Sequence, residues 1–195
     1  MNDLERRAFA VDGLTIEARD GKPPMLVGHA AVFGQLSEDL GGFREQILPG
    51  AFSDAITTDD VRALFNHDPN FVLGRNRAKT LEMSEDTTGL AIRISMPETQ
   101  TIRDLVLEPI RRGDITQMSF QFSVRPGGQD WAKNDAGQSI RTLKKVRLYD
   151  ISPVTYPAYP QTDIAVRELR TFQASIVPAV PMNLLRAKAL LASAL

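Results

Sequence analysis

The ten residues "ITQMSFQFSV" (115–124) alternate between polar and large apolar side chains. This period of two predicts a β-strand, because successive side chains of a strand point to opposite faces of a sheet. One face would carry Met118, Phe120, Phe122 and Val124, and the other Gln117, Ser119, Gln121 and Ser123. The strand therefore holds Ser119 rigidly on a polar face, backed by large apolar side chains. On the pattern alone, a solvated strand face with a merely polar serine is the more common explanation.

More short strands are predicted on both sides of this one. Apolar runs bounded by turn residues cover 14–19, 25–34, 43–48, 61–67 and 140–156, with several shorter runs between 71 and 96. Residues 1–13 are expected to form a polar lead-in, and the strand over 61–67 to end in a turn at Asp68-Pro69. Many short strands with few helices predict a mainly β fold of the α+β class. We expect a mostly antiparallel β-barrel flanked by helices.

Three helices are predicted: a short one over 49–56, the principal one over Thr99–Arg112, and a mostly apolar one in the tail after its two prolines. Thr99 or Thr101 would cap the principal helix, and Gly113 would end it. Its buried stripe would consist of Ile102, Leu105, Val106 and Ile110. Pro109 removes one helical hydrogen bond, so a kink or an early end is expected there.

The amino-acid composition limits the classes of protein to which the chain can belong. The chain has 195 residues and a net charge of −1, with 23 basic and 24 acidic residues, which leaves no basic footprint for nucleic acid. Cysteine is absent, so disulfides, thiolate metal sites and a cysteine nucleophile are excluded. No apolar run approaches the roughly 20 residues that span a bilayer, and "MNDLERRAF" resembles no secretion signal. We expect a cytosolic protein without membrane contact, with one domain over 1–166 and a tail over 167–195.

A nucleophilic serine needs a neighbouring base to take its proton. The chain offers two histidines and several lysines. Alternation places His29 level with Val27 and Ala31, which favours a packed or edge position. His67 ends its strand at a turn, from where an imidazole can reach a groove, although an isolated histidine is more often structural.

An imidazole that acts as base also needs a group that fixes its tautomer. Asp68 is adjacent to His67, but an aspartate before proline more often caps a turn. Alternation in "KVRLYDISPV" places Asp150 on the face of Val146 and Leu148, where a carboxylate is costly unless it is paired. Its partner could be a histidine N–H, or else the backbone or a nearby lysine or arginine. These two readings of Asp150 are evenly balanced at this point.

Other kinds of site find little support. Two distant histidines without an HExxH motif argue against a metal site, and the phosphate-binding glycine motifs are absent. We therefore expect no cofactor and no metal.

Several segments together resemble the prohead (capsid maturation) serine proteases of tailed phages. In the order of that family, the chain contains "GHAAVFG", "ILPGAF", "LFNHDPNFVLGR", "GDITQMSFQF" and "LYDISPVTYPAYPQT". They cover roughly residues 26–166. The resemblance implies a fold like that of the herpesvirus maturation protease, with Ser119 as nucleophile and His67 as general base. The herpesvirus relatives use a second histidine as third member; here His29 lies upstream, so Asp150 is the best candidate.

The resemblance also implies a biological role. The chain would be a serine endopeptidase that cleaves scaffold proteins, extensions of the major capsid protein and itself during prohead maturation. It would act in the host cytoplasm, inside the assembling prohead of a phage or prophage. Removal or docking of the tail over 167–195 would fit autocleavage, and homodimerisation, as in the herpesvirus relatives, stays open.

Two alternatives remain. The chain could be a non-enzymatic scaffold or assembly protein with the same barrel, or a hydrolase with a Ser–Lys pair that uses Lys144 or Lys145. The oxyanion donors are unassigned, because "TYPAYPQT" (155–162) lacks the arginine pair that relatives carry in this place.

Overall fold

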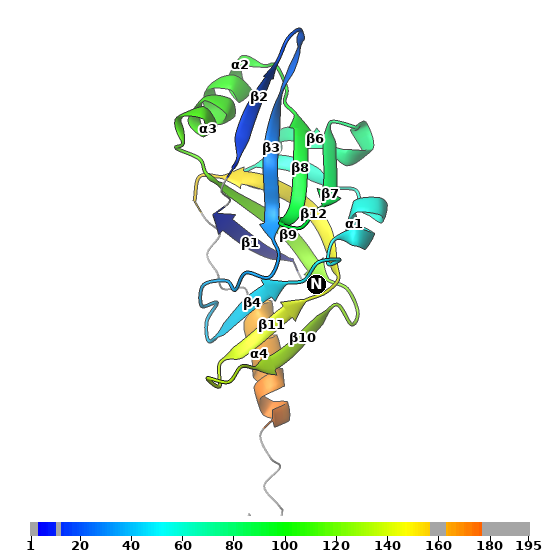
Figure 1. Ribbon diagram of the computed structural model, residues 1–195, viewed down its shortest axis with the longest axis vertical. Helices are drawn as coiled ribbons and strands as arrows, with labels where there is room; N and C mark the ends of the chain where they lie inside the picture. Colours follow the sequence, from blue (N-terminus) through cyan, green and yellow to red (C-terminus); the bar gives the residue numbers. More distant parts are fainter. Residues whose placement is uncertain (1–3, 11–12, 157–162, 177–195) are drawn as a thin grey trace, which may run out of the picture.

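Alternating apolar residues fold most of the chain into strands of three sheets, as Figure 1 shows. The computed structural model describes residues 4–10, 13–156 and 163–176. The largest sheet has the order β1 (Glu5–Ala10), β9 (Gln117–Val124), β12 (Val146–Val154), β5 (Arg62–Phe65) and β6 (Asp68–Arg75). Its neighbours are antiparallel except for β12 and β5, which are parallel.

Two smaller sheets complete the β structure. The four-stranded sheet is antiparallel, with the order β2 (Thr15–Arg19), β3 (Lys22–Val32), β8 (Gly89–Ser95) and β7 (Leu81–Glu85). The three-stranded sheet has the order β10 (Gln129–Lys133), β11 (Ser139–Leu143) and β4 (Phe43–Ile47). The helical elements are α1 (Ser53–Thr58), η1 (Asn76–Ala78), α2 (Gln100–Ile102), η2 (Arg103–Leu107), α3 (Glu108–Arg112) and α4 (Asp163–Ile176).

The predicted α+β class is confirmed, but the described residues form no closed barrel. The largest sheet keeps two edges, β1 and β6, which do not pair with one another. The other two sheets are separate layers, so the strands never close into one ring. Kinship with the herpesvirus fold therefore stays a prediction.

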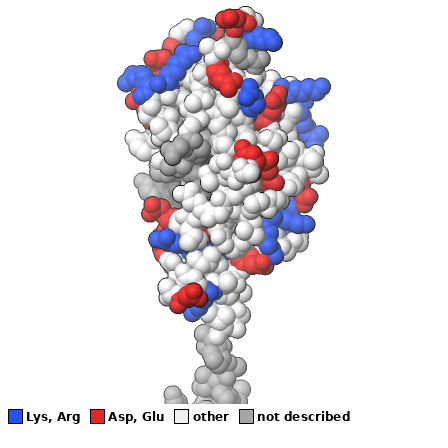
Figure 2. Space-filling model, viewed as in Figure 1, with Lys and Arg blue, Asp and Glu red and all other residues white. Residues whose placement is uncertain are grey.

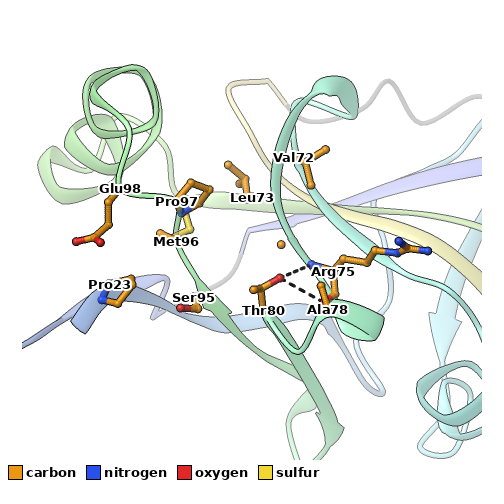
Figure 3. A pocket seen from close by; sticks show the side chains of 11 residues that line it. Pro23, Val72, Leu73, Arg75, Ala78, Thr80, Ser95, Met96, Pro97 and Glu98 are labelled. Atoms are coloured by element: carbon orange, nitrogen blue, oxygen red, sulfur yellow. Dashed lines mark hydrogen bonds between the residues drawn. The ribbon is translucent and has the colours of Figure 1, made fainter. Parts of the chain in front are cut away.

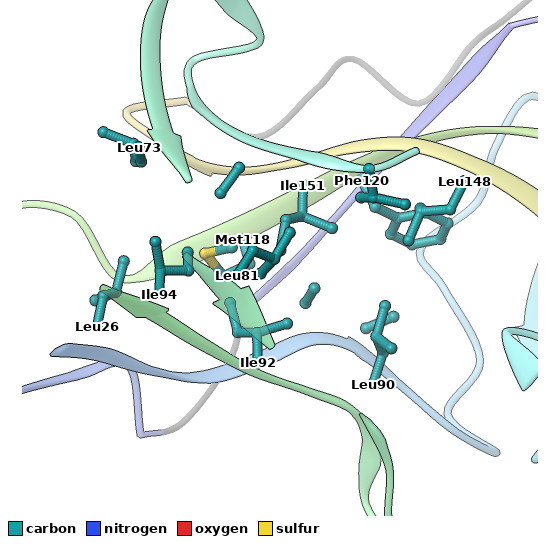
Figure 4. Close-up of a cluster of buried hydrophobic side chains, with 14 of the residues drawn as sticks. Leu26, Leu73, Leu81, Leu90, Ile92, Ile94, Met118, Phe120, Leu148 and Ile151 are labelled. Atoms are coloured by element: carbon teal, nitrogen blue, oxygen red, sulfur yellow. The ribbon is translucent and has the colours of Figure 1, made fainter. Parts of the chain in front are cut away.

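The main core lies between the five-stranded and the four-stranded sheet (Figure 4). Leu26, Leu90 and Ile92 of the smaller sheet face Met118, Phe120 and Ile151 of the larger one. All six are at most 1 % exposed. Only one face of the larger sheet is used in this contact, which leaves its opposite face, the one with Ser119, for other groups.

Two predicted elements differ from the observed ones. The polar lead-in contains β1, whose residues pair with β9 from Glu5 opposite Phe122 to Ala10 opposite Gln117. The single strand predicted over 140–156 is divided into β11 and β12. It divides because the N–H groups of Lys144 and Lys145 both donate to the carbonyl of Gly128, at 2.7 and 3.0 Å, which turns the chain.

The principal helix extends from Gln100 to Arg112, as predicted, but through α2, the π-helical turn η2 and α3. The hydroxyl of Thr99 caps its start, and Gly113 ends it with a φ of 80°. The wide turn lies just before Pro109, whose missing N–H interrupts the helical ladder. It also rotates the side chains, so Leu107 is buried in place of Leu105, which is 48 % exposed.

Helix α4 and the three-stranded sheet form a second, smaller core. Leu169 of α4 packs with Leu40 and Phe43, and the rings of Trp131 and Phe172 stack at 5.8 Å. Helix α4 spans the predicted boundary between residues 166 and 167, and that boundary stays a prediction. The apolar helix predicted in the tail falls mostly on residues 177–195, which lie outside the described residues.

A buried group of charges joins these parts, and we name it the ion-pair cluster. Its members are Glu5 and Arg7 of β1, Glu45 of β4, Arg141 of β11 and Glu168 of α4. Arg141 is fully buried and lies 2.7 Å from Glu5, 3.0 Å from Glu45 and 2.8 Å from Glu168. The cluster therefore ties β1 and α4 to the three-stranded sheet.

Candidate active site

Strand β9 presents Ser119 on the face of the largest sheet that points away from the main core. Met118, Phe120 and Phe122 are fully buried in the core, as the alternation predicts. Ser119 is also fully buried, although it lies on the opposite face. Ser119 is therefore not a serine on a solvated strand face, although that is the more common explanation of such a sequence pattern.

A β-bulge brings Asp150 to the face of Ser119. In β12, Leu148 pairs with Phe122, but Asp150 pairs with Gln121, so Tyr149 is an extra residue between them. The bulge reverses the alternation after Leu148. The prediction that Asp150 shares a face with Val146 and Leu148 is therefore wrong, and Asp150 instead shares the face of Ser119 and Ser152.

Asp59 accounts for this irregular geometry in part. Its carboxylate accepts the backbone N–H of Leu148 at 2.9 Å, directly before the bulge. The same carboxylate is held by Arg125 at 2.7 Å. The side chain of Asp59 thus accepts the N–H of Leu148, beside the bulged residue. In a regular strand, this N–H would donate to the neighbouring strand instead.

His67 lies in a tight turn between β5 and β6. Asn66 and His67 have φ values of 53° and 57°, in the left-handed region that asparagine and histidine tolerate better than most residues. The turn therefore comes earlier than predicted: Asp68 is the first residue of β6, and its carboxylate accepts the N–H of Asn70 at 2.8 Å. Because β5 runs parallel to β12, the turn lies at the same end of the sheet as Ser152 and Pro153.

The three predicted site residues lie in one hydrogen-bonded row. His67 Nε2 is 2.7 Å from Ser119 Oγ, and His67 Nδ1 is 2.5 Å from Asp150 Oδ1. A carboxylate can only accept, so we assign the imidazole proton to Nδ1. Nε2 then carries a lone pair and accepts the hydroxyl proton of Ser119. This is the order of contacts that a nucleophile, a base and an orienting acid require.

Water has little access to this row. The side chains of His67 and Asp150 are 5 % and 9 % exposed, and Ser119 is fully buried. A low local dielectric strengthens each of these hydrogen bonds.

The sequence did not point to Ser152, which lies beside the row. Its hydroxyl is 3.1 Å from Asp150 Oδ1 and 3.2 Å from the backbone nitrogen of His67. Ser152 follows Asp150 by two residues and pairs with Ser119 across the sheet. The spacing of two in "DIS" was thus the one available signal.

The other candidate bases take part in other contacts. His29 is half-buried, and its Nε2 lies 2.8 Å from Asp86 Oδ2. This bond and the N–H of Gly89 hold the pKa of Asp86 below its usual range. Lys144 is paired with Asp130 at 2.8 Å, and Lys145 is exposed. The geometry therefore favours His67 over either lysine as the partner of Ser119.

A pocket of about 520 Å³ lies between β6 and the segment that joins β8 to α2 (Figure 3). Val72, Leu73, Met96 and Pro97 make its lining mostly apolar, and Arg75 and Glu98 add one charge of each sign. None of the three site residues lines it. Most of the stretch "TYPAYPQT" (155–162), where relatives carry the arginine pair, lies outside the described residues, and the oxyanion donors stay unassigned.

Charged side chains show no concentration of one sign on the face seen in Figure 2, where acidic and basic groups are interspersed among the described residues. Within the described ranges, no group of three or more acidic residues or histidines is placed to hold a metal ion. No helix of the described chain is both long enough and apolar enough to cross a bilayer.

Comparison with known proteins gives one family and one fold. A family model described as caudovirus prohead serine protease matches residues 12–175. Among solved structures, the bacteriophage T4 capsid assembly protease, gp21, is similar with a TM-score of 0.50 and 14 % identity, over 79 % of this chain and 98 % of the T4 chain. At this identity the likeness concerns the fold. No curated protein sequence matches the chain.

Proposed function

The chain belongs to the caudovirus prohead serine proteases, and from this membership we propose that Ser119, His67 and Asp150 are its catalytic residues. Family membership makes the chain a serine protease of capsid maturation and excludes the non-enzymatic alternative. The observation that supports the residue assignment is the row of two hydrogen bonds, 2.7 and 2.5 Å long, that passes from Ser119 through His67 to Asp150.

The geometry suits acyl-enzyme chemistry. Ser119 Oγ attacks the peptide carbonyl carbon while its proton passes to His67 Nε2, and Asp150 stabilises the imidazolium that forms. The C–N bond of the substrate then breaks, and Nε2 gives its proton to the leaving amine. Water attacks the acyl-enzyme through the same base, and Ser119 is regenerated.

The substrates in this proposal are the building proteins of the capsid. They comprise a scaffold protein or a scaffold-like extension of the major capsid protein, and the protease itself. The reaction would take place in the host cytoplasm, within the assembling prohead. Kinship in fold with the herpesvirus maturation protease, and a homodimer of the kind formed there, belong to the same proposal.

Co-expression with the capsid and scaffold proteins of the same phage tests the assignment. Wild-type protein should shorten at least one of them, and mass spectrometry would map the cleavage site. Ser119→Ala and His67→Ala should each abolish the cleavage, while Lys144→Ala and Lys145→Ala should retain it. Cleavage by Ser119→Ala would remove the nucleophile from the proposal, and cleavage by His67→Ala would favour a Ser–Lys pair.

A further inference from the structure

The hydroxyl of Ser152 touches two of the three catalytic residues, although the reaction assigns it no role. It lies 3.1 Å from the carboxylate of Asp150 and 3.2 Å from the backbone nitrogen of His67. Ser152 is fully buried. Because solvent does not reach this hydroxyl, its orientation is set by the protein groups that it contacts.

Each of these two contacts can be formed in only one direction. A backbone N–H can only donate, so the oxygen of Ser152 accepts from His67. A carboxylate can only accept, so the hydroxyl proton points to Asp150. Ser152 Oγ also lies 3.4 Å from His67 Nδ1, but the Nδ1 proton has its shorter bond to Asp150. Ser152 is thus a bridge of defined polarity from the backbone of the base to the orienting acid.

The turn that carries His67 needs such support, because it is strained. Two successive non-glycine residues, Asn66 and His67, lie in the left-handed region, which costs backbone free energy that the surrounding contacts must offset. The end of β12 and the residue after it hold the first of them: Asn66 donates its backbone N–H to Pro153 at 3.1 Å. The side chain of Asn66 accepts the N–H of Thr155 at 2.9 Å and donates to the hydroxyl of Thr155 at 3.1 Å. For the second residue, the catalytic base itself, the backbone N–H is held by Ser152.

We propose that Ser152 is a positioning residue of this protease, which holds His67 and Asp150 in their relative orientation through its hydroxyl. The proposal rests on the proposed roles of Ser119, His67 and Asp150. Ser152 does not contact the reacting atoms, so its loss should lower kcat and leave KM nearly unchanged. A misplacement of the base by about 1 Å can cost about 100-fold in rate, and we expect a loss between about 10-fold and 100-fold.

The variants Ser152→Ala and Ser152→Cys test this inference, with Ser123→Ala as the matched control. Ser123 lies on the neighbouring strand of the same sheet, and its hydroxyl bonds to Tyr149 at 3.1 Å, outside the catalytic row. Cysteine keeps most of the side-chain volume but is a weak donor, so kcat should fall in the order wild type, Cys, Ala. Turnover is measured with a peptide that spans the mapped cleavage site.

A second readout does not depend on activity. The Nδ1 proton of His67, shared with a carboxylate, should give a far-downfield proton NMR signal, which Ser152→Ala should shift or broaden and Ser123→Ala should leave in place. An unchanged kcat together with an unchanged NMR signal in Ser152→Ala would overturn the inference. An equal loss of kcat in Ser152→Ala and Ser123→Ala would also overturn it. Should Ser152→Ala not fold, Ser152→Cys carries the same comparison. Ser119→Ala in the same cleavage assay tests the proposed function separately. This variant keeps the Nδ1 proton of His67 and its bond to Asp150, so the NMR signal of that proton can still be used to test the role of Ser152.

Discussion

Two buried polar clusters differ in the kind of group they contain. The proposed catalytic row of Ser119, His67 and Asp150 contains one carboxylate beside a hydroxyl and an imidazole, two groups that can exchange a proton. The ion-pair cluster consists only of carboxylates and guanidinium groups, which come from β1, β4, β11 and α4. Apart from Glu168, whose side chain is partly exposed, the residues of both clusters are nearly inaccessible to water, so burial alone does not distinguish a reactive site from a structural one.

The difference lies in whether a proton can move. In the ion-pair cluster, burial by itself would raise the pKa of Glu5, but the hydrogen bond and charge of Arg141, with the charge of Arg7, hold this pKa below its usual range. Burial likewise disfavours the charge of Arg141, but Glu5, Glu45 and Glu168 together outweigh it, so the pKa of Arg141 is raised. These residues stay charged, and they stabilise. In the proposed mechanism, His67 accepts a proton from Ser119 and returns it, as general acid–base catalysis requires.

The largest effect is expected for Asp150→Asn, which keeps the shape of the acid and removes its charge. An amide at this place favours the wrong imidazole tautomer, so cleavage should slow by about 10³–10⁴-fold. The thermal unfolding temperature should change little. The measurement is the cleavage rate of the mapped peptide, with Asp130→Asn at the exposed pair to Lys144 as control. A rate within twofold of wild type would assign the third role to another group.

Arg141→Met should have the opposite effect to Asp150→Asn: it should lower the stability of the fold and leave the cleavage rate unchanged. It removes one of the two cations, Arg141 and Arg7, that pair with the buried carboxylates of Glu5 and Glu45, and the excess negative charge left behind costs about 3–5 kcal/mol in the free energy of unfolding. Urea unfolding measures this loss, and the cleavage rate per folded molecule should be unchanged. Lys144→Met, at a partly exposed pair, serves as the control. A folded variant with wild-type stability would contradict the structural role of the cluster.

A smaller effect is expected from acid. Because the pKa of Glu5 is lowered in the folded protein, its contribution to stability is present above the ordinary value of 4.5 and is lost as the pH falls through the folded value below it. Urea unfolding between pH 7 and pH 3 should show this decline, beyond the decline of Glu5→Gln, whose neutral side chain does not titrate. Parallel curves for the two proteins would show that Glu5 is not responsible.

The smallest effect is expected for Glu168→Gln, which weakens the contact between α4 and the cluster. The side chain of Glu168 is 31 % exposed, so solvent screens its pair with Arg141. We expect a loss of about 1 kcal/mol or less, diminished further by salt. Hydrogen exchange of the α4 amides at low and high salt measures it. Slower exchange in the variant than in wild type would show that the pair does not hold α4.

Local features of the fold were predictable where one short pattern decides them. The alternation over 115–124 places Met118 and Phe120 in the core. Thr99 and Gly113 mark the ends of the principal helix, because a capping hydroxyl and a left-handed glycine act within one turn. The extended pattern of the chain also indicated the α+β class. The buried stripe of the helix was wrong at Leu105, because the π-helical turn shifts the period by one residue.

The candidate site was predictable as a set of residues but not as a geometry. Ser119, His67 and Asp150 came from alternation, from a need for partners and from the family resemblance, and the structure brings all three together. The reason given for Asp150 was wrong, since the bulge at Tyr149 reverses its face. Ser152 was missed, because its role depends on the backbone of a residue 85 positions away.

The sequence by itself determined which segments are extended, which face of β9 is apolar and which few side chains could act as nucleophile, base and acid. These properties depend on neighbours within a few residues, so they can be seen in the chain. The tertiary structure alone decided the bulge beside Asp59, the left-handed turn at His67, the pairing of β1 and the separation into three sheets. Each of these depends on partners far away in the chain, whose register is settled only when the sheets pack against one another.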